Sequence, residues 1–407
     1  MDNNNGLELS MIPKELRLLL EIITMENEES IGSFKDDLDW ELFLKLAKHH
    51  RVYPLIYSKL IKINENLVPR HVFQILHQEY KKNLFQMLHL SGEMEQVSKL
   101  FTENQIRLLF LKGPVIASEI YGDISLRTSK DLDILIPLSD VKRAGELLMK
   151  NGYEREEIPK FDNWRNHDVS YFHPQKRIEI ELHSRLHAYP MNVPSFNELW
   201  ERKRISKLTS YPVHFLGHED LFLYLVSHGA KHGWFRLRWL VDIDQIIRKR
   251  VVSQKNNFLL LKYQHQHLGK QANLLRGQAL LLVSELLKTP ICNELRLLTE
   301  EKRSKKFAQL ALSYIIGMGD FRQSKDDLSK CRNNSPFSIK SNFQKWFLMN
   351  HYQFLIKSNL HKFIFILQLF YPSSVDEKTL RLPKSLRFLY FPLRPFLWAW
   401  RMTRKTI

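Results

Sequence analysis

The sequence contains little of what marks several common classes of protein. Only two of its 407 residues are cysteines, Cys292 and Cys331, which is too few for a disulfide framework or a cysteine-based zinc site. It has only 14 glycines, and its composition is neither collagen-like nor disordered. The longest apolar stretch, at 363–371, is broken by Gln368 and is shorter than the roughly 20 residues that a membrane-spanning helix needs.

Acidic residues are also scarce. The 44 Asp and Glu residues are outnumbered by 61 Lys and Arg, which gives a formal net charge of +17. From Arg332 to the C-terminus, thirteen Lys and Arg residues are accompanied by only two acids, Asp376 and Glu377. This excess indicates an anionic partner, for which a nucleotide, a nucleic acid or a lipid surface qualifies. Residues 1–5 lack the basic-then-apolar pattern of a signal peptide, so we expect a cytoplasmic protein.

The apolar pattern changes twice along the chain. Residues 13–100 have the spacing of helices, with Pro13 and Asp39 near two helix starts. Residues 106–183 alternate short apolar runs with helical stretches, and the chain is mainly helical again from Glu219. We therefore expect an α+β fold in four parts. These are a helical region at 1–100, a core with strands and helices at 101–215, a helical domain at 216–330, and a basic, aromatic-rich region at 331–407.

Particular elements follow from this pattern. We expect strands at 106–111, 132–136, 167–173 and 177–183. Two short helices should lie between them, at 115–121 after Pro114 and at 139–151 before Gly152. Beyond the core, helical spacing predicts helices at 219–232, 236–250, 253–290 and 301–317.

Asp131 and Asp133 carry the strongest chemical signal. They are two residues apart in a predicted strand, so both carboxylates project from one face while Leu132 points into the core. Two ionised carboxylates repel each other unless a cation lies between them. The pair therefore predicts a site for a hard divalent cation such as Mg²⁺, which prefers oxygen ligands. The alternative is a solvated strand end, but the apolar residues that flank the pair indicate a buried strand.

A third carboxylate can come from the strand predicted at 177–183. Glu179, Glu181 and His183 share one face of this strand, while isoleucines and a leucine form the other. If the strand neighbours that of Asp131, Glu181 can reach the metal, and Glu179 is the competing choice. An amphipathic strand with a polar solvent face is the simpler alternative.

Four short motifs lie close together in the middle of the chain: Leu111-Lys112-Gly113, Tyr121-Gly122-Asp123, Leu126-Arg127 and Asp131-Leu132-Asp133-Ile134-Leu135-Ile136. Together they resemble the signature of the uncharacterised nucleotidyltransferase family, the NTP-transferase type 5 group of the DNA polymerase β-like superfamily. The step Glu181-Leu182-His183 is similar to the third-carboxylate motif of that family. Segments at 39–55, 228–242, 369–373 and 393–395 have family parallels as well, so the resemblance covers most of the chain.

The resemblance implies a polymerase β-like core and nucleotidyl transfer, in which an acceptor oxygen attacks the α-phosphorus of an NTP and pyrophosphate leaves. Two Mg²⁺ ions, or Mn²⁺ in their place, would be held by three catalytic residues: Asp131, Asp133 and Glu181. Glu181 would either bind the second metal or take the proton of the acceptor.

The resemblance also implies a phosphate-binding turn. Lys112 and Gly113 stand where the superfamily has its Gly-Ser turn, but Pro114 replaces the serine and removes both a hydroxyl and a backbone donor. Lys112 can compensate as a point charge. Arg127 would either pair with the triphosphate or brace Asp131 or Asp133.

His228 and His232 are four residues apart on a predicted helix, a spacing that can bind zinc. The metalloprotease motif needs Glu after the first histidine, and Gly229 stands there instead, so we exclude that chemistry. We expect both histidines to line a cleft together with Lys231 and Arg236. The expected nucleotide-binding residues here are therefore His183, His228, Lys231, His232 and Arg236. An ordinary polar helix face is the alternative.

Aromatic and cationic residues alternate at 386–401. Such a stretch can lie at a membrane interface or stack on single-stranded nucleic acid. We favour packing on the body of the protein, because Pro392 and Pro395 limit a continuous amphipathic helix.

The sequence therefore predicts a Mg²⁺-dependent nucleotidyltransferase that uses an NTP, with ATP the expected nucleotide. By family analogy, the acceptor is a small molecule or a peptide or protein side chain, and a partner encoded in a biosynthetic cluster is one candidate. One rival is an RNA-modifying nucleotidyltransferase, which the charge of +17 would suit. Another is a non-catalytic, antitoxin-like nucleotide-binding protein, which the presence of Asp131, Asp133 and Glu181 argues against.

Overall fold

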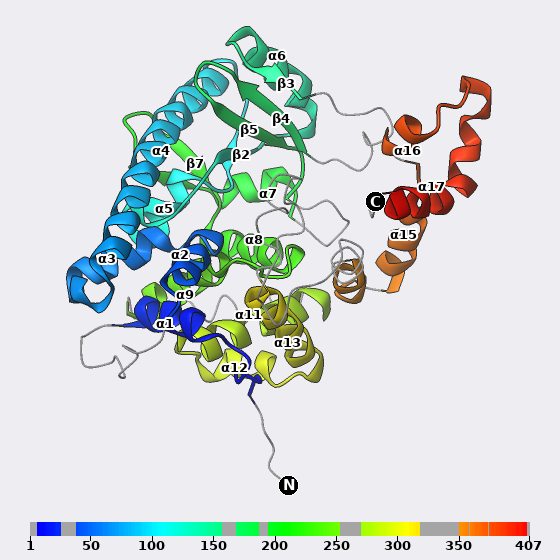
Figure 1. Cartoon of the computed structure of the whole chain (residues 1–407). Helices are drawn as coiled ribbons and strands as arrows, with labels where there is room; N and C mark the ends of the chain where they lie inside the picture. The colour runs from blue at the N-terminus through cyan, green and yellow to red at the C-terminus, as the bar shows by residue number, and fades with distance from the viewer. Residues whose placement is uncertain are drawn as a thin grey trace.

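The computed structural model describes residues 6–25, 38–156, 168–186, 194–252, 270–317, 350–357, 359–372 and 374–404. Within these ranges, helices surround one mixed sheet (Figure 1), which confirms the expected α+β fold. None of the helices in these ranges is long and apolar enough to cross a membrane.

Four α-helices precede the sheet: α1 (Lys14–Thr24), α2 (Trp40–His49), α3 (Tyr53–Ile63) and α4 (Arg70–Glu103). Asp39 caps α2, because its side chain accepts a hydrogen bond from Leu42 N at 2.9 Å. Pro54 lies in the first turn of α3, where a missing backbone donor costs nothing. With 34 residues, α4 is roughly 50 Å long and runs past the sheet (Figure 1). The predicted N-terminal helices are thus confirmed.

The sheet has the strand order β3-β4-β5-β2-β1-β7-β6. Its strands are β1 (Leu109–Phe110), β2 (Asp131–Leu135), β3 (Glu154–Arg155), β4 (Asp168–His173), β5 (Ile178–His183), β6 (Arg204–Ser206) and β7 (Val213–Phe215). Strand β2 lies at the centre, antiparallel to β1 and parallel to β5. The side chains of Leu132 and Ile134 are fully buried, so the sheet is anchored where β2 carries its acids.

The predicted strands of the core are confirmed in β2, β4 and β5, whereas the predicted strand at 106–111 is much shorter as β1. Strands β3, β6 and β7 were not predicted. Each has only two or three residues, too few to show an alternating pattern, so pairing with neighbours rather than local sequence makes them strands.

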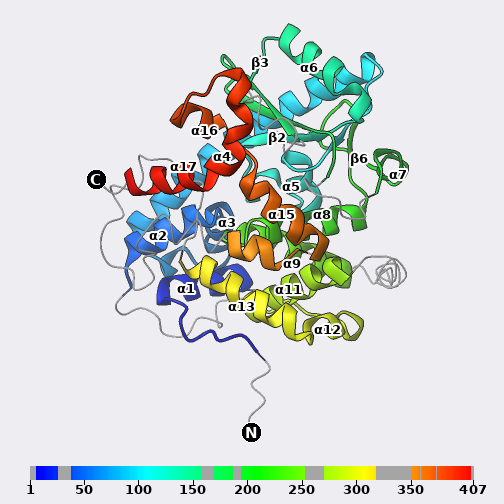
Figure 2. The same ribbon diagram turned by 90° about the vertical axis from the view of Figure 1, so that its right-hand side faces the viewer.

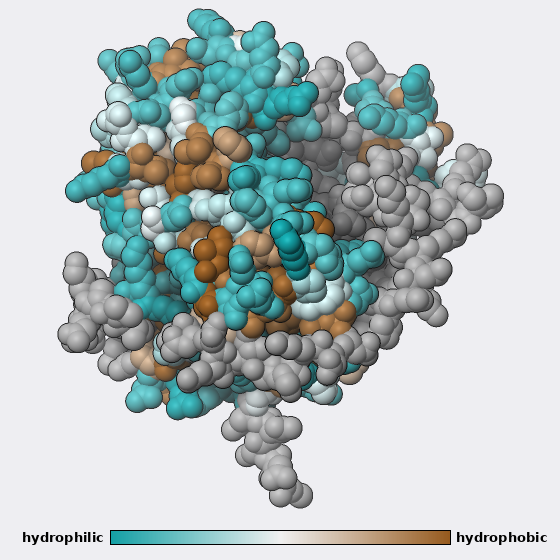
Figure 3. Space-filling model, turned by 60° about the vertical axis from the view of Figure 1, so that its left-hand side comes forward, coloured by the Kyte–Doolittle hydropathy of each residue, from teal (hydrophilic) through white to brown (hydrophobic). Residues whose placement is uncertain are grey.

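Short helices connect the strands. The predicted helices at 115–121 and 139–151 are confirmed as α5 (Pro114–Tyr121) and α6 (Val141–Lys150). Among the described residues, η3 (Ile124–Leu126), η4 (Leu138–Asp140) and α7 (Phe196–Glu201) also lie between strands, whereas η2 (Glu65–Leu67) lies between α3 and α4. Figure 3 turns forward the side of the molecule that lies to the left in Figure 1; hydrophilic residues predominate in its upper part, and apolar patches lie below them.

A helical block follows the sheet and includes α8 (His218–Lys231), α9 (Leu237–Val252), α11 (Lys270–Leu287), α12 (Asn293–Thr299) and α13 (Lys302–Ile316). Helices α8, α9 and α13 confirm three predicted helices. The fourth, predicted at 253–290, is confirmed in α11, while its part at 253–269 lies outside the described residues. Helix α11 packs against α8, α9, α12 and α13 and also against α1, so the block and the N-terminal helices share a core.

A tight turn joins α8 to α9. Trp234 is fully buried there and lies so close to Gly229 that a Cβ on this glycine would meet the indole Cζ3 at 2.2 Å. Gly229 therefore has a packing role in the turn, which is consistent with our exclusion of a metalloprotease motif at this place.

The C-terminal residues form an arm of α15 (Asn359–Phe370), α16 (Ser374–Thr379), η5 (Lys384–Leu389) and α17 (Tyr390–Arg404), visible at the right of Figure 1 and facing the viewer in Figure 2. The expectation that prolines would interrupt a helix here is wrong. Pro392 lies in the first turn of α17, so only Pro395 removes a hydrogen bond from the helix interior.

Candidate functional site

The parallel pairing of β2 with β5 aligns the acids of the two strands. Asp131 lies opposite Glu179, and Asp133 lies opposite Glu181. The two strands are therefore neighbours, which is the condition under which Glu181 can reach the aspartates. Glu181 lines the same pocket as both aspartates, whereas Glu179 is outside that lining. The geometry thus favours Glu181 over Glu179 as the third carboxylate.

Three side chains converge closely enough to share a cation: Asp133, Glu181 and His183, whose ligand atoms lie within 4.8 Å of one another. His183 Nε2 is 3.3 Å from Asp133 Oδ1 and 3.5 Å from Glu181 Oε2. Asp131 was expected in this group, but within the described residues His183 completes it. Asp131 instead lines the pocket beside it. His183, expected to bind nucleotide, is thus placed among the metal-binding candidates.

Asp133 is oriented by two cationic partners. Lys112 Nζ donates a hydrogen bond to Asp133 Oδ1 at 2.6 Å, on the oxygen that also faces His183. The second oxygen, Oδ2, is buried and has no hydrogen-bond partner among the described residues. A buried carboxylate oxygen without a donor is costly, and a divalent cation would satisfy it. The residues present therefore fit a hard metal ion.

The two aspartates have opposite electrostatic environments. Burial, reinforced by the negative charge of Asp133, raises the pKa of Asp131 to about 6. Burial also disfavours ionised Asp133, but the positive charge of Lys112 and the hydrogen bond from His183 outweigh it and lower the pKa of Asp133. Without metal, Lys112 and His183 therefore supply the positive charge that keeps Asp133 ionised.

His183 and Lys112 are stabilised as cations in return. Burial opposes protonation of His183, but hydrogen bonds with Asp133 and Glu181 prevail and raise its pKa to about 9. Burial likewise opposes the Lys112 charge, and the adjacent Asp133 carboxylate more than compensates and raises the pKa of Lys112.

The predicted phosphate turn has a defined backbone. Gly113 has φ +92° and precedes α5 directly, a conformation that side chains rarely adopt. Pro114 begins the helix as expected. Lys112 lines the pocket, but Gly113 is outside its described lining. The structure therefore gives Gly113 a conformational role, and its contact with nucleotide stays a prediction.

Arg127 is held by a partner that the sequence analysis missed. Its Nε and Nη2 each lie 3.0 Å from a different oxygen of Asp242, and Tyr121 donates to the same carboxylate at 2.8 Å. Arg127 is 1% exposed and Asp242 is 0% exposed. Of the two roles considered for Arg127, bracing Asp131 or Asp133 is not what the structure shows, because its guanidinium group is paired with Asp242 on α9.

Arg127 belongs to a group that we call the arginine wall, made of Arg51, Arg127, Arg236 and Arg238, all of which line the pocket. Arg238 is buried, and its Nη1 donates to Thr128 Oγ1 at 3.0 Å. Burial and then repulsion by Arg127 and Arg51 lower the pKa of Arg238, with Asp242 opposing the shift. Several guanidinium groups thus lie near one buried carboxylate, that of Asp242. The arginine wall therefore keeps an excess of positive charge.

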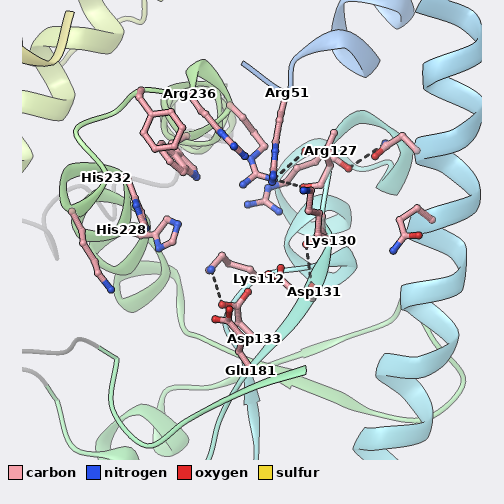
Figure 4. Close-up of a pocket in the computed structure, with 18 of the residues that line it drawn as sticks. Arg51, Lys112, Arg127, Lys130, Asp131, Asp133, Glu181, His228, His232 and Arg236 are labelled. Carbon is pink, nitrogen blue, oxygen red and sulfur yellow. Dashed lines mark hydrogen bonds and ion pairs between the residues drawn. The ribbon is translucent and has the colours of Figure 1, made fainter. Parts of the chain in front are cut away.

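One pocket of about 890 Å³ contains both the carboxylates and the arginine wall. Figure 4 shows Asp131, Asp133 and Glu181 on one side, with Arg51 and Arg236 on another. Nine Lys and Arg residues against four Asp and Glu residues line the described part of this pocket. The cationic members are Lys48, Arg51, Lys82, Lys112, Arg127, Lys130, Lys231, Arg236 and Arg238. Such a lining suits an anionic ligand with a bound cation.

The histidines predicted on α8 also lie in the pocket. His228, Lys231, His232 and Arg236 all line it. The rings of His228 and His232 are 4.7 Å apart, and His232 stacks on Trp239 at 5.2 Å. Burial and then the charge of Lys112 lower the pKa of His228 well below its usual range. His228 is therefore a neutral hydrogen-bonding group rather than a cation.

Sequence reasoning missed Arg51, Lys130, Tyr224, Arg238 and Asp242. Asp242 had a usable signal, since it is an acid within the apolar run Trp239-Leu240-Val241, where a charge needs a buried partner. Arg51 comes from the turn between α2 and α3, and only the fold brings it to the pocket.

A comparison with known families matches residues 36–283 to the uncharacterised nucleotidyltransferase family. No curated protein and no solved structure matches the chain. The matched segment covers more than half of the sequence. It includes Asp133, Glu181 and His183, which we call the acidic cluster, and every residue of the arginine wall. The chain belongs to this family and is a nucleotidyltransferase.

Proposed function

We propose that this nucleotidyltransferase uses Mg²⁺ to transfer a nucleoside monophosphate from an NTP to a hydroxyl or similar group of an acceptor. The observation that carries the proposal is a single pocket with two opposed charges. The in-register acids of β2 and β5 form one side, and the arginine wall forms the other. A nucleoside triphosphate with a divalent cation has the complementary charges.

The acids hold the metal in this account. Asp131, Asp133 and Glu181 would bind Mg²⁺, with the buried Oδ2 of Asp133 the best-placed ligand atom. The ion would supply positive charge at the α-phosphate. In the reaction, an acceptor oxygen forms a bond to the α-phosphorus, the bond to the β-phosphate oxygen breaks, and pyrophosphate leaves. Glu181 or water takes the proton of the acceptor.

The cationic residues have separate roles. His183 orients Asp133 through the contact between its Nε2 and Asp133 Oδ1. A bound cation would neutralise Asp133 in place of Lys112. The ammonium group of Lys112 would then be available to contact phosphate. Asp242 holds the Arg127 side chain in place by accepting hydrogen bonds from it. Arg127 would therefore contribute positive charge to the arginine wall without losing side-chain entropy when the nucleotide binds.

The arginine wall would bind the phosphate groups of the nucleotide, together with Lys231. Guanidinium groups recognise phosphate well because their donors form a planar fork. His228 and His232 would donate to or accept from the nucleotide or the acceptor. ATP is the expected nucleotide, and the acceptor is a small molecule or a peptide or protein side chain.

One observation favours a second candidate function. The net charge of +17 suits an RNA acceptor, whose phosphates would reward a broad positive field. An RNA-modifying enzyme should bind RNA with steep salt dependence, whereas the small-molecule or peptide reaction should be nearly insensitive to salt.

Labelling of a cell extract tests these alternatives. The protein is supplied with Mg²⁺ and each of four NTPs labelled at the α-phosphate, and the labelled product is digested separately with ribonuclease and protease. We expect one NTP to label a ribonuclease-resistant acceptor. Label that ribonuclease removes would establish the RNA reaction instead, and equal labelling by the Asp133→Asn variant would exclude the proposed site.

A further inference from the structure

The C-terminal arm leaves an apolar stripe exposed on α15. Phe363, Ile366, Leu367 and Phe370 are exposed by 60%, 42%, 53% and 47%. Their spacing of three, four and seven residues places them on one face of the helix. Monomeric proteins rarely expose large apolar side chains side by side in this way. The stripe thus has the character of a contact surface.

Four aromatic residues of η5 and α17 are exposed as well, namely Phe388, Phe391, Phe396 and Trp400. The expectation that this stretch packs on the body of the protein is therefore wrong for these four side chains. Helix α17 packs against α15, α16 and η5 instead.

The arm has its own fixed interior. Asp376 is 0% exposed and binds Arg401 Nη1 at 2.7 Å and Arg394 Nη1 at 3.3 Å. Tyr390 is also fully buried and donates to Leu380 O at 2.6 Å. These contacts hold α16 and the segment after it against α17, and α17 in turn packs against α15, which carries the stripe.

The charge of the arm is positive. Between residues 359 and 404 there are eight Lys and Arg and only two acids, Asp376 and Glu377. Both acids are already bound by arginines of the arm, since Glu377 pairs with Arg387 at 2.8 Å. Lys378 and Arg381 are exposed. The outer surface of the arm therefore combines apolar side chains with excess positive charge.

We propose that the arm docks this enzyme on an anionic lipid surface, with the stripe of α15 inserted among the acyl chains and the cations at the headgroups. Exposed apolar side chains beside Lys and Arg are what an interfacial helix uses. Lipid binding by the arm would determine where the enzyme is located and is independent of the reaction in its pocket.

The side chains of the stripe favour lipid over other partners. Stacking on single-stranded RNA uses aromatic faces, but Ile366 and Leu367 are aliphatic and offer no ring. A second copy of the chain would bring an equally cationic arm, and like charges across a symmetric interface repel. An anionic bilayer satisfies both the apolar and the charged parts.

Sedimentation of the full chain with vesicles tests the proposal. Vesicles of phosphatidylcholine with about 30% phosphatidylglycerol should bind the protein, and vesicles of phosphatidylcholine alone should bind it much less. The double variant Phe363→Glu/Leu367→Glu should bind anionic vesicles at least about tenfold more weakly, because it places charges in the apolar layer. The variant Lys378→Ala/Arg381→Ala should weaken binding roughly tenfold to thirtyfold, by removing two cations.

A matched control uses exposed residues outside the arm. Phe85 and Leu297 are exposed by 69% and 71%, so Phe85→Glu/Leu297→Glu makes the same chemical change elsewhere and should bind vesicles normally. All variants should melt at the temperature of the unaltered protein. Failure of the intact chain to bind anionic vesicles, or unchanged binding by Phe363→Glu/Leu367→Glu, would overturn the proposal. Self-association or RNA binding that the stripe variant abolishes, with vesicle binding intact, would also contradict it.

Discussion

Asp133 combines full burial with an unsatisfied carboxylate oxygen, and the chemistry of the pocket is arranged around it. Lys112 and His183 contact its other oxygen, and Glu181 lies opposite on the neighbouring strand. Its neighbour Asp131 has no such cationic contact and is raised in pKa by burial and by Asp133. The two aspartates should therefore respond differently to loss of charge.

Asp133→Asn should abolish transfer and also lower the free energy of unfolding by about 2 kcal/mol, because it leaves two buried cations without their anion. Asp131→Asn should abolish transfer as well, but it should raise the stability of the metal-free protein by about 1 kcal/mol at pH 7.5. The gain in stability follows from the raised pKa of Asp131. The fold disfavours the ionised carboxylate, and at pH 7.5, above the pKa of about 6, the carboxylate is ionised. Asparagine carries no charge and avoids this cost. Urea unfolding of the two variants in EDTA measures both changes, and equal destabilisation would contradict this account.

Glu181 and Glu179 offer a matched pair on one strand face. Glu181→Gln should reduce the transfer rate by about a thousandfold, because the carboxylate reaches the cluster of Asp133 and His183. Glu179→Gln should reduce it by less than about tenfold, since Glu179 is outside the described lining of the pocket. Initial rates of both variants at saturating Mg²⁺ settle the choice, and the reverse order would assign the role to Glu179.

Metal binding should depend on pH in a defined window. A divalent ion needs ionised Asp131, whose pKa of about 6 makes affinity rise about tenfold per pH unit below pH 6. A second, shallower rise should continue towards the His183 pKa of about 9, as the cationic histidine loses its charge. Calorimetric titration with Mn²⁺ between pH 5 and 9 measures the profile. A flat profile would show that neither group is linked to the metal.

At the scale of elements, the turn between α8 and α9 positions much of the pocket. His228 and Lys231 come from α8, Arg236 comes from the turn itself, and Arg238 comes from the start of α9. The backbone of Arg238 donates to His50 O at 3.2 Å, which ties this turn to the end of α2. A small displacement of the turn should therefore move the side chains that α8, the turn and α9 contribute to the pocket.

Gly229→Ala provides that displacement. Its new Cβ would overlap the ring of Trp234 at 2.2 Å, and overpacking of this kind costs about 2–3 kcal/mol of unfolding free energy. Gly92→Ala, in the middle of α4, meets nothing within 4 Å and should stabilise the protein by about 0.5–1 kcal/mol. Thermal melting compares the two, and equal melting temperatures would mean that the turn can relax around the methyl group.

The acidic cluster was predictable at this scale because a strand has a short period. Asp131 and Asp133 are two residues apart, as are Glu181 and His183, so alternation alone placed each pair on one face. The pairing of β2 with β5 was left open, because alternation shows that a strand has a buried face but not which strand lies beside it. The inclusion of His183 rather than Asp131 in the closest group depends on side-chain directions that periodicity does not specify.

Across the whole molecule, the order of helical and strand-containing regions could be read from the sequence, but the opposite wall of the pocket could not. Arg127 and Asp242 are 115 residues apart, and no local pattern links an arginine before β2 to an acid in α9. The short strand β7 likewise depends on long-range pairing with β1, and β6 joins the sheet only by pairing with β7. Local chemistry thus predicted the acidic side of the pocket, and only the fold revealed the arginine wall.

Two places carry much of the net charge of the molecule. One is the pocket, where cationic residues outnumber acids in the described lining, and the other is the C-terminal arm with its excess of Lys and Arg. We assign the first to the triphosphate and the second to an anionic lipid surface. In this account the net charge of +17 does not require an RNA partner.

The position of the transferred phosphorus tests the central claim most directly. The protein is incubated with Mg²⁺, a cell extract and ATP labelled at either the α- or the γ-phosphate, beside the Asp133→Asn variant and an EDTA control. We predict that label from the α-phosphate enters the acceptor, that label from the γ-phosphate leaves as pyrophosphate, and that the variant and the EDTA control transfer neither. Transfer of the γ-label, or full α-label transfer by Asp133→Asn, would contradict the account.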